Sequence, residues 1–119
     1  MSYVDGFLVP VPKKKLAAYR SLAKKAGKLW LEHGALQYCE CVGDDLAPKG
    51  AVPFTKGLKL KRGETLVFAW IAYRNKAHRD KVNAIIMKDP RIASLCSPTE
   101  MPFDFKRMVY GGFKSIVSY

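Results

Sequence analysis

The apolar positions of this chain follow two spacings, alternation and recurrence every three to four residues, and these predict its elements. Residues 3–10 are rich in β-branched and aromatic side chains and end at Pro10, which predicts a first strand. Over residues 13–33 the apolar positions recur at spacings of three and four, which predicts an amphipathic helix with a basic outer face. Gly34 is a stop signal for that helix.

The middle of the chain predicts two further strands. Residues 36–42 alternate, with Tyr38 and Glu40 on one side and Cys39 and Cys41 on the other. The glycine- and proline-rich stretch 43–63 is expected to be a long loop or a short extra hairpin. Residues 65–73 are the most apolar segment and predict a central strand buried on both sides.

The last third predicts a helix and a closing strand. Asn75 is a favourable N-cap for a helix over 76–89, and a short helical turn is expected over 92–95. Residues 97–104 read as a linker and 106–117 as the last strand.

Strand, helix, strand, strand, helix, strand is the order of the ferredoxin-like βαββαβ fold. We therefore expect one α+β domain over residues 1–119, a four-stranded antiparallel sheet with two helices on one face. The other face still carries apolar side chains from the third strand. The simplest way to bury these apolar side chains is contact with a second copy of the chain, so we expect a homodimer.

Composition limits the class of protein. The chain has 119 residues, no apolar run of about 18 residues that could span a bilayer, and no signal-peptide pattern at its start. Its three cysteines cannot all pair with one another. Free thiols and a cytoplasmic location without membrane association are therefore expected.

The net charge of +11 favours an anionic partner such as a phosphorylated ligand, a nucleic acid or an acidic protein. Lysine and arginine are spread through both halves of the chain, whereas a nucleic-acid module usually concentrates them on one face. A solvated basic surface is therefore the simpler interpretation, and nucleic-acid binding is disfavoured without being excluded.

Several longer motifs resemble one family. They are the opening Tyr3-Val4-Asp5-Gly6-Phe7-Leu8-Val9-Pro10-Val11-Pro12, and then Glu32-His33-Gly34-Ala35-Leu36, Cys41-Val42-Gly43-Asp44-Asp45, Val82-Asn83-Ala84, Asp89-Pro90-Arg91, Met101-Pro102-Phe103-Asp104 and Arg107-Met108-Val109-Tyr110-Gly111-Gly112-Phe113. Together they resemble the YbaA-like bacterial family, a domain of unknown function. The resemblance implies a dimeric α/β-barrel fold and no assigned activity. The wider fold includes cofactorless monooxygenases, haem-degrading enzymes and ligand binders, so it transfers no chemistry.

Two residues are candidate catalytic groups. Asp5 lies inside an apolar strand, where a carboxylate is either a pocket acid or base of raised pKa or is paired, for example with Arg107, or caps a turn at Gly6. His33 ends the apolar stripe of the first helix and is either a general base, a haem ligand or a helix-end residue.

Four residues are candidate ligand-binding groups. Trp70, Tyr38 and Tyr110 lie in strands and either line a pocket for a flat ligand or belong to a dimer core. Arg107 either holds a ligand carboxylate or phosphate or pairs with Asp104 or Asp5.

No resident metal or cofactor is expected. The chain has two histidines, no His-x-x-x-His and no Cys-x-x-Cys, and Cys39-Glu40-Cys41 is a weak motif. Haem binding through His33 or His78 is kept as an alternative. Glycine-rich phosphate loops and nucleophile elbows are absent from the sequence.

The sequence therefore favours a small-molecule-binding dimer whose ligand is anionic or aromatic. In a cofactorless oxygenase-like version, Asp5 or His33 removes a proton and Arg107 holds the anion. The alternative is a non-enzymatic, stress-associated or interaction protein that binds an anionic partner through its basic surface. Whether the protein is an enzyme is left open.

Overall fold

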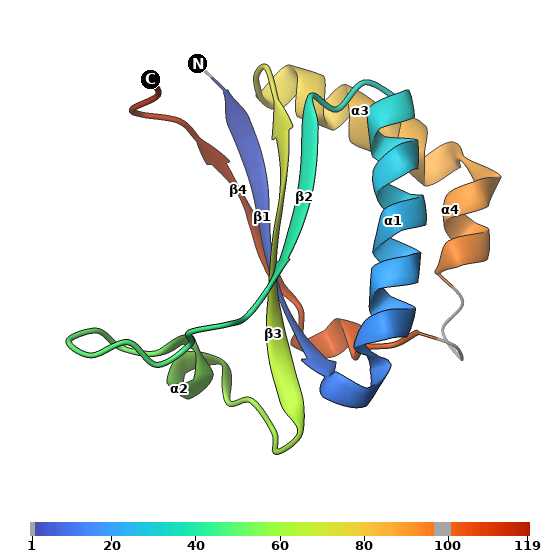
Figure 1. Ribbon diagram of the computed structural model, residues 1–119. Coiled ribbons are helices and arrows are strands. Elements are labelled where there is room, and N and C mark those ends of the chain that lie inside the picture. Colours follow the sequence, from blue (N-terminus) through green and yellow to red (C-terminus); the bar gives the residue numbers. More distant parts are fainter. Residues whose placement is uncertain (1, 97–100) are drawn as a thin grey trace.

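The sheet organises the molecule. The computed structural model describes residues 2–96 and 101–119, and within them four strands form one antiparallel sheet (Figure 1). The strands are β1 (Tyr3–Pro12), β2 (Gln37–Val42), β3 (Glu64–Tyr73) and β4 (Val109–Lys114). Their spatial order, β2-β3-β1-β4, is that of the ferredoxin-like fold, so the α+β prediction is confirmed.

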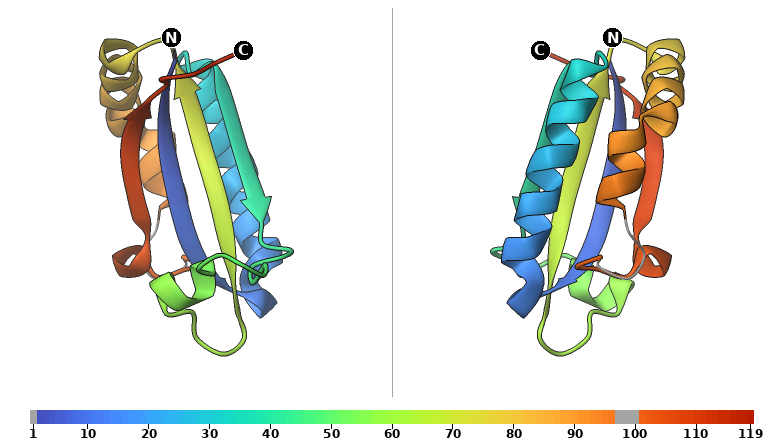
Figure 2. Two further views of the ribbon diagram at one scale, coloured as in Figure 1. Left: turned by 90° about the vertical axis from the view of Figure 1, so that its left-hand side faces the viewer. Right: turned by 90° about the vertical axis from the view of Figure 1, so that its right-hand side faces the viewer.

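Three helices cover one face of this sheet. They are α1 (Leu16–Glu32), α3 (Lys76–Lys88) and α4 (Pro90–Leu95), all on the same side in Figures 1 and 2. A 3₁₀ turn, η1 (Lys13–Lys15), leads into α1. Asn75 caps α3 as predicted, since its side chain accepts from the backbone N–H of His78 at 2.8 Å.

Two segments differ from the expected structure. The 43–63 stretch is a long loop, one of the two expected alternatives, and it also contains a short helix, α2 (Phe54–Leu58), that was not expected. The last strand ends at Lys114 and begins only at Val109, because residues 105–107 form a 3₁₀ turn, η2 (Phe105–Arg107), capped by Asp104. Part of the predicted linker, 97–100, lies outside the described residues.

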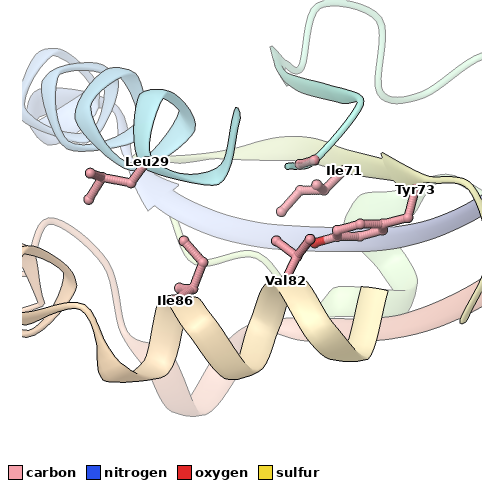
Figure 3. Close-up of a cluster of buried hydrophobic side chains, with 6 residues drawn as sticks. Leu29, Ile71, Tyr73, Val82 and Ile86 are labelled. Carbon is pink, nitrogen blue, oxygen red and sulfur yellow. The ribbon is translucent and has the colours of Figure 1, made fainter. Parts of the chain in front are cut away.

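The core lies between the sheet and the helices. The odd-numbered residues of β1 and β3 point to the helices, so that Val9 pairs with Val67 across the strands and both are buried. A second cluster joins β3 to the helices through Leu29, Ile71, Tyr73, Val82 and Ile86 (Figure 3). Full burial of one such side chain stabilises the fold by about 1.5–3 kcal/mol.

The opposite face of the sheet carries no helix over its centre, as the left view of Figure 2 shows. The 43–63 segment with α2 lies at the lower end of this face (Figure 1). We call the remainder the bare face. Strand pairing places on it Val4, Gly6, Leu8, Cys39, Cys41, Phe68, Trp70, Ala72, Val109, Gly111 and Phe113. None of these is charged, and Phe68, Val109 and Phe113 are about half exposed or more.

Candidate functional site

A cavity of about 370 Å³ lies between the covered face of the sheet and the helices. β1, β2 and β3 form its floor, α1, α3 and α4 form its walls, and residues 101–108 close one side. Most of the lining is apolar. Its aromatic and methionine members are Phe7, Tyr19, Trp30, Tyr38, Phe103, Phe105, Tyr110, Met87, Met101 and Met108.

Local periodicity brings the lining together. Alternation directs Asp5, Phe7 and Val9 of β1 to the helix side. On α1, spacings of three and four turn Ala23 and Ala26 toward the same space. Two alanines leave room where larger side chains would fill the interior.

The first polar corner of the cavity is Asp5, which is 2% exposed. Its Oδ1 accepts from Nη1 of Arg79 at 3.1 Å, and Nη2 of Arg79 donates to the Tyr3 hydroxyl at 3.1 Å. Burial raises the pKa of Asp5 above its usual range, and the nearby Arg79 charge opposes that shift only in part.

Asn83 and Tyr73 extend this corner. Asn83 Oδ1 accepts from Trp30 Nε1 and from the Tyr73 hydroxyl, each at 3.4 Å. Burial, and then the Asp5 charge, raise the pKa of Tyr73 to about 12, so its hydroxyl stays protonated near neutral pH. Each of these side chains therefore has at least one hydrogen-bond partner, although the buried Nε of Arg79 accounts for none of these bonds.

The second polar corner is Glu40 on β2. Its two carboxylate oxygens accept hydrogen bonds from two tyrosines, Oε1 from the Tyr19 hydroxyl and Oε2 from the Tyr38 hydroxyl at 2.6 Å. Burial and the adjacent Glu40 charge raise the pKa of both tyrosines well above their usual range. Both phenols therefore remain hydrogen-bond donors to the carboxylate.

Three of the predicted site residues, Asp5, Tyr38 and Tyr110, lie on the cavity wall. Tyr110 is 61% exposed and stacks on Phe7 with ring centroids 5.4 Å apart. It therefore stands at the rim of the cavity, on strand β4.

The other three lie elsewhere. Trp70 is on the bare face, because it pairs with Gly6 and alternates with the inward-facing residues of β3. His33 follows the end of α1, with Nε2 2.7 Å from Asp89 Oδ2. Arg107 donates to both carboxylate oxygens of Glu64, at 2.6 and 3.0 Å.

The partners of the charged residues also differ from those expected. Asp5 pairs with Arg79, and neither Asp5 nor Asp104 is the ion-pair partner of Arg107. Arg79 of α3 reaches Asp5 and Tyr3 near the start of β1, whereas Arg107 meets Glu64 at the start of β3, which pairs with the other end of β1. Asp5, His33 and Arg107 therefore do not meet at one place, and of the three only Asp5 lines the cavity.

Sequence reasoning left four site residues unassigned, namely Tyr19, Glu40, Arg79 and Asn83. A signal existed for Glu40, a carboxylate on the Tyr38 side of an amphipathic strand. A signal also existed for Tyr19, a polar tip in the apolar stripe of α1. Arg79 resembles its solvated basic neighbours, so no local pattern distinguishes it.

One cluster outside the cavity gathers metal-type donors. Glu32, His33 and Asp89 have ligand atoms within 4.8 Å of one another. The guanidinium of Arg91 already bridges the two carboxylates, donating to Asp89 at 2.7–3.2 Å and to Glu32. This cluster is therefore an ion-pair network that ties the end of α1 to the start of α4.

Among the described residues, no helix combines the length and the apolar character needed to cross a membrane. By overall shape, the chain is similar to a solved dimeric ferredoxin-like protein from an uncultured marine organism. The TM-score is 0.60 with 11% identity, and the match covers 100% of both chains. At this identity the likeness shows the fold alone.

By sequence, the chain is 45% identical over 117 residues to the uncharacterized protein YbaA of Escherichia coli (strain K12), covering 98% of each chain. The Shigella flexneri protein of the same name matches with the same figures. Residues 2–105 match the family described as "Protein of unknown function (DUF1428)". The chain therefore belongs to the DUF1428 family, to which the YbaA-like motifs of its sequence pointed.

Proposed function

We propose that this chain is a small-molecule-binding protein that acts as a homodimer, with its ligand in the cavity between the sheet and the helices. The observation that carries the proposal is a largely apolar cavity with two polar corners, at Asp5 and Glu40. Binding sites for small molecules have this composition, and their volumes begin at about 300 Å³. The volume and the aromatic lining favour a small, partly aromatic ligand.

The bare face supports the homodimer. A chain with 21 basic and 10 acidic residues places no charge among the central residues of this face. Exposed Phe68 and Phe113 form part of an apolar patch of the kind that marks a protein contact. A second copy presents the same uncharged surface, and the structural neighbour is described as dimeric.

An oxygenase-like reaction has less support than binding. Asp5 lines the cavity and has a raised pKa, as a general base requires. His33 is held by Asp89 outside the cavity, and Arg107 is held by Glu64. Asp5 is therefore the one proposed catalytic residue that retains a position on the cavity wall.

The cytoplasmic location stays part of the proposal. Cys39, Cys41 and Cys96 are free thiols, and Cys39 and Cys41 have their Sγ atoms 3.7 Å apart without a disulfide. Free thiols of this kind persist in reducing compartments.

The test of binding uses a neutral fluorescent probe, N-phenyl-1-naphthylamine, titrated into the wild type. We expect saturable binding that Ala26→Phe reduces at least tenfold, because Ala26 lines the cavity and a phenyl ring would occupy it. Ala18→Phe places the same ring on the exposed side of α1 and should leave binding unchanged. Equal probe binding by both variants, or none by the wild type, would contradict the proposal.

A second candidate is binding of an anionic partner through the basic surface. Arg20, Lys24 and Lys28 recur every four residues on α1 and line a shallow groove beside β2. Fluorescence anisotropy with a labelled single-stranded oligonucleotide tests it. Steep loss of affinity with added salt, together with weaker binding by Lys24→Gln, supports this candidate. Absence of binding at low salt removes it.

A further inference from the structure

We propose that the cavity binds an apolar ligand bearing a protonated amine more tightly than the corresponding carboxylate. The Glu40 carboxylate distinguishes the two, because it attracts the ammonium and repels the carboxylate. The inference rests on the proposed binding function and names the class of its ligand. It reverses the sequence-based expectation of an anionic ligand held by Arg107.

The two carboxylates of the cavity differ in how their charge is balanced. Asp5 is paired with the Arg79 guanidinium at 3.1 Å. Glu40 has hydrogen bonds from the hydroxyls of Tyr19 and Tyr38, and no lysine, arginine or histidine of the described residues lies within 4.0 Å of its carboxylate. Its negative charge is therefore solvated by two neutral donors and has no cation in ion-pair contact.

Glu40 can still accept further hydrogen bonds. A carboxylate offers about four acceptor positions, two on each oxygen. Tyr19 uses one on Oε1 and Tyr38 uses one on Oε2. The remaining positions suit the N–H groups of an ammonium, which would form charge-assisted bonds roughly twice as strong as neutral ones.

The rest of the lining disfavours an anion. Among the described residues, the cavity is lined by two carboxylates and by no lysine, arginine or histidine. Arg20, Lys24 and Lys28 line a shallow groove that shares Ala23, Tyr38 and Glu40 with the cavity, but these three basic side chains do not line the cavity itself. A bound carboxylate would therefore lose its hydration and meet like charge without a compensating cation.

The aromatic lining beside Glu40 favours the same class. Trp30 and Tyr38 lie with ring centroids 6.2 Å apart and both line the cavity. Their π faces attract a cation. The apolar body of the ligand would then lie against Phe7, Met87 and Met108.

Three probes of one shape test the inference: 2-(1-naphthyl)ethylamine, 2-(1-naphthyl)ethanol and 1-naphthaleneacetate, each measured by calorimetry. For the wild type we expect the amine to bind at least tenfold more tightly than the alcohol, and the carboxylate most weakly. For Glu40→Gln the preference for the amine should fall below threefold, with alcohol binding within threefold of the wild type.

Asp44→Asn is the matched control, because it removes one carboxylate charge from the exposed 43–63 segment and should keep the full preference. Alcohol affinity reports whether the cavity of each variant is intact.

The outcomes separate the two proposals. Binding of the alcohol without preference for the amine, or a preference that survives Glu40→Gln, overturns the inference and leaves the binding function standing. Failure of all three probes and of N-phenyl-1-naphthylamine to bind the wild type overturns both.

Discussion

The two faces of the sheet differ in the charged residues that they carry. The face covered by helices contains two carboxylates, Asp5 and Glu40, each held by hydrogen bonds from other side chains. The bare face has no charged residue at its centre and leaves Phe68 and Phe113 exposed. The same strands supply both faces, since successive residues point to opposite sides.

This difference indicates how each face is used. A buried charge costs several kcal/mol unless it is paired, so the covered face keeps its carboxylates only where donors meet them. An uncharged apolar face can be buried without any such arrangement. The contrast supports a cavity on one side of the sheet and a contact with a second copy on the other.

Removing the partner of Asp5 should break the covered face most severely. We expect Arg79→Met to lower the free energy of unfolding by about 3 kcal/mol at pH 7, because it leaves a buried carboxylate unpaired. Urea denaturation measures the loss. Asp5→Asn combined with Arg79→Met should recover most of it, and a double variant no more stable than Arg79→Met would contradict this explanation.

A charge on the bare face should break the proposed dimer. We expect Phe68→Lys to raise the dimer dissociation constant about a hundredfold, or about 2.7 kcal/mol, because two like charges would be buried at a symmetric contact. Light scattering after size exclusion measures the mass.

Leu31→Lys is the control for this variant. Leu31 is 50% exposed and Phe68 is 47% exposed, but Leu31 lies on α1, on the other side of the sheet. It should leave the mass unchanged. A monomeric wild type, or a Phe68→Lys variant that remains dimeric, would remove the bare face as the contact.

The smallest expected effect is the pH dependence of the free energy of unfolding, which compares the buried carboxylate Asp5 with the ion-paired carboxylate Asp89. Burial raises the pKa of Asp5 above its ordinary value of 3.8. The titration of Asp5 therefore adds to the free energy of unfolding in full below pH 3.8, and this addition is lost as the pH rises through the folded-state pKa. Hydrogen bonds, first from Arg91 and then from His33, hold the pKa of Asp89 well below its usual range. The Asp89 contribution is therefore present above pH 3.8 and is lost as the pH falls.

Between about pH 3 and pH 6, the stability of the wild type relative to Asp5→Asn should therefore fall with rising pH. Relative to Asp89→Asn it should rise at the acidic end of that range. Thermal unfolding midpoints across the range check both slopes, and slopes of the same sign would contradict the assignment.

The fold was largely predictable, and the site only in part. Alternation along the strands grouped Asp5 and Tyr38 with the side chains of the covered face. The preference of asparagine for the N-cap position predicted the start of α3 at Asn75. Trp70 had no such guide, because β3 is apolar on both sides and its sequence does not say which side meets the helices. The short α2 and the late start of β4 depend on turn and capping contacts that the hydrophobic pattern does not record.

The sequence by itself determined which side chains share a face, because alternation in a strand and the 3.6-residue turn of a helix are local properties of the backbone. Only the tertiary structure decided which of them meet. Asp5 and Arg79 lie 74 positions apart, and Tyr19 and Glu40 lie 21 apart. Their pairing depends on the register of the strands and on where each helix crosses the sheet, which no local period specifies.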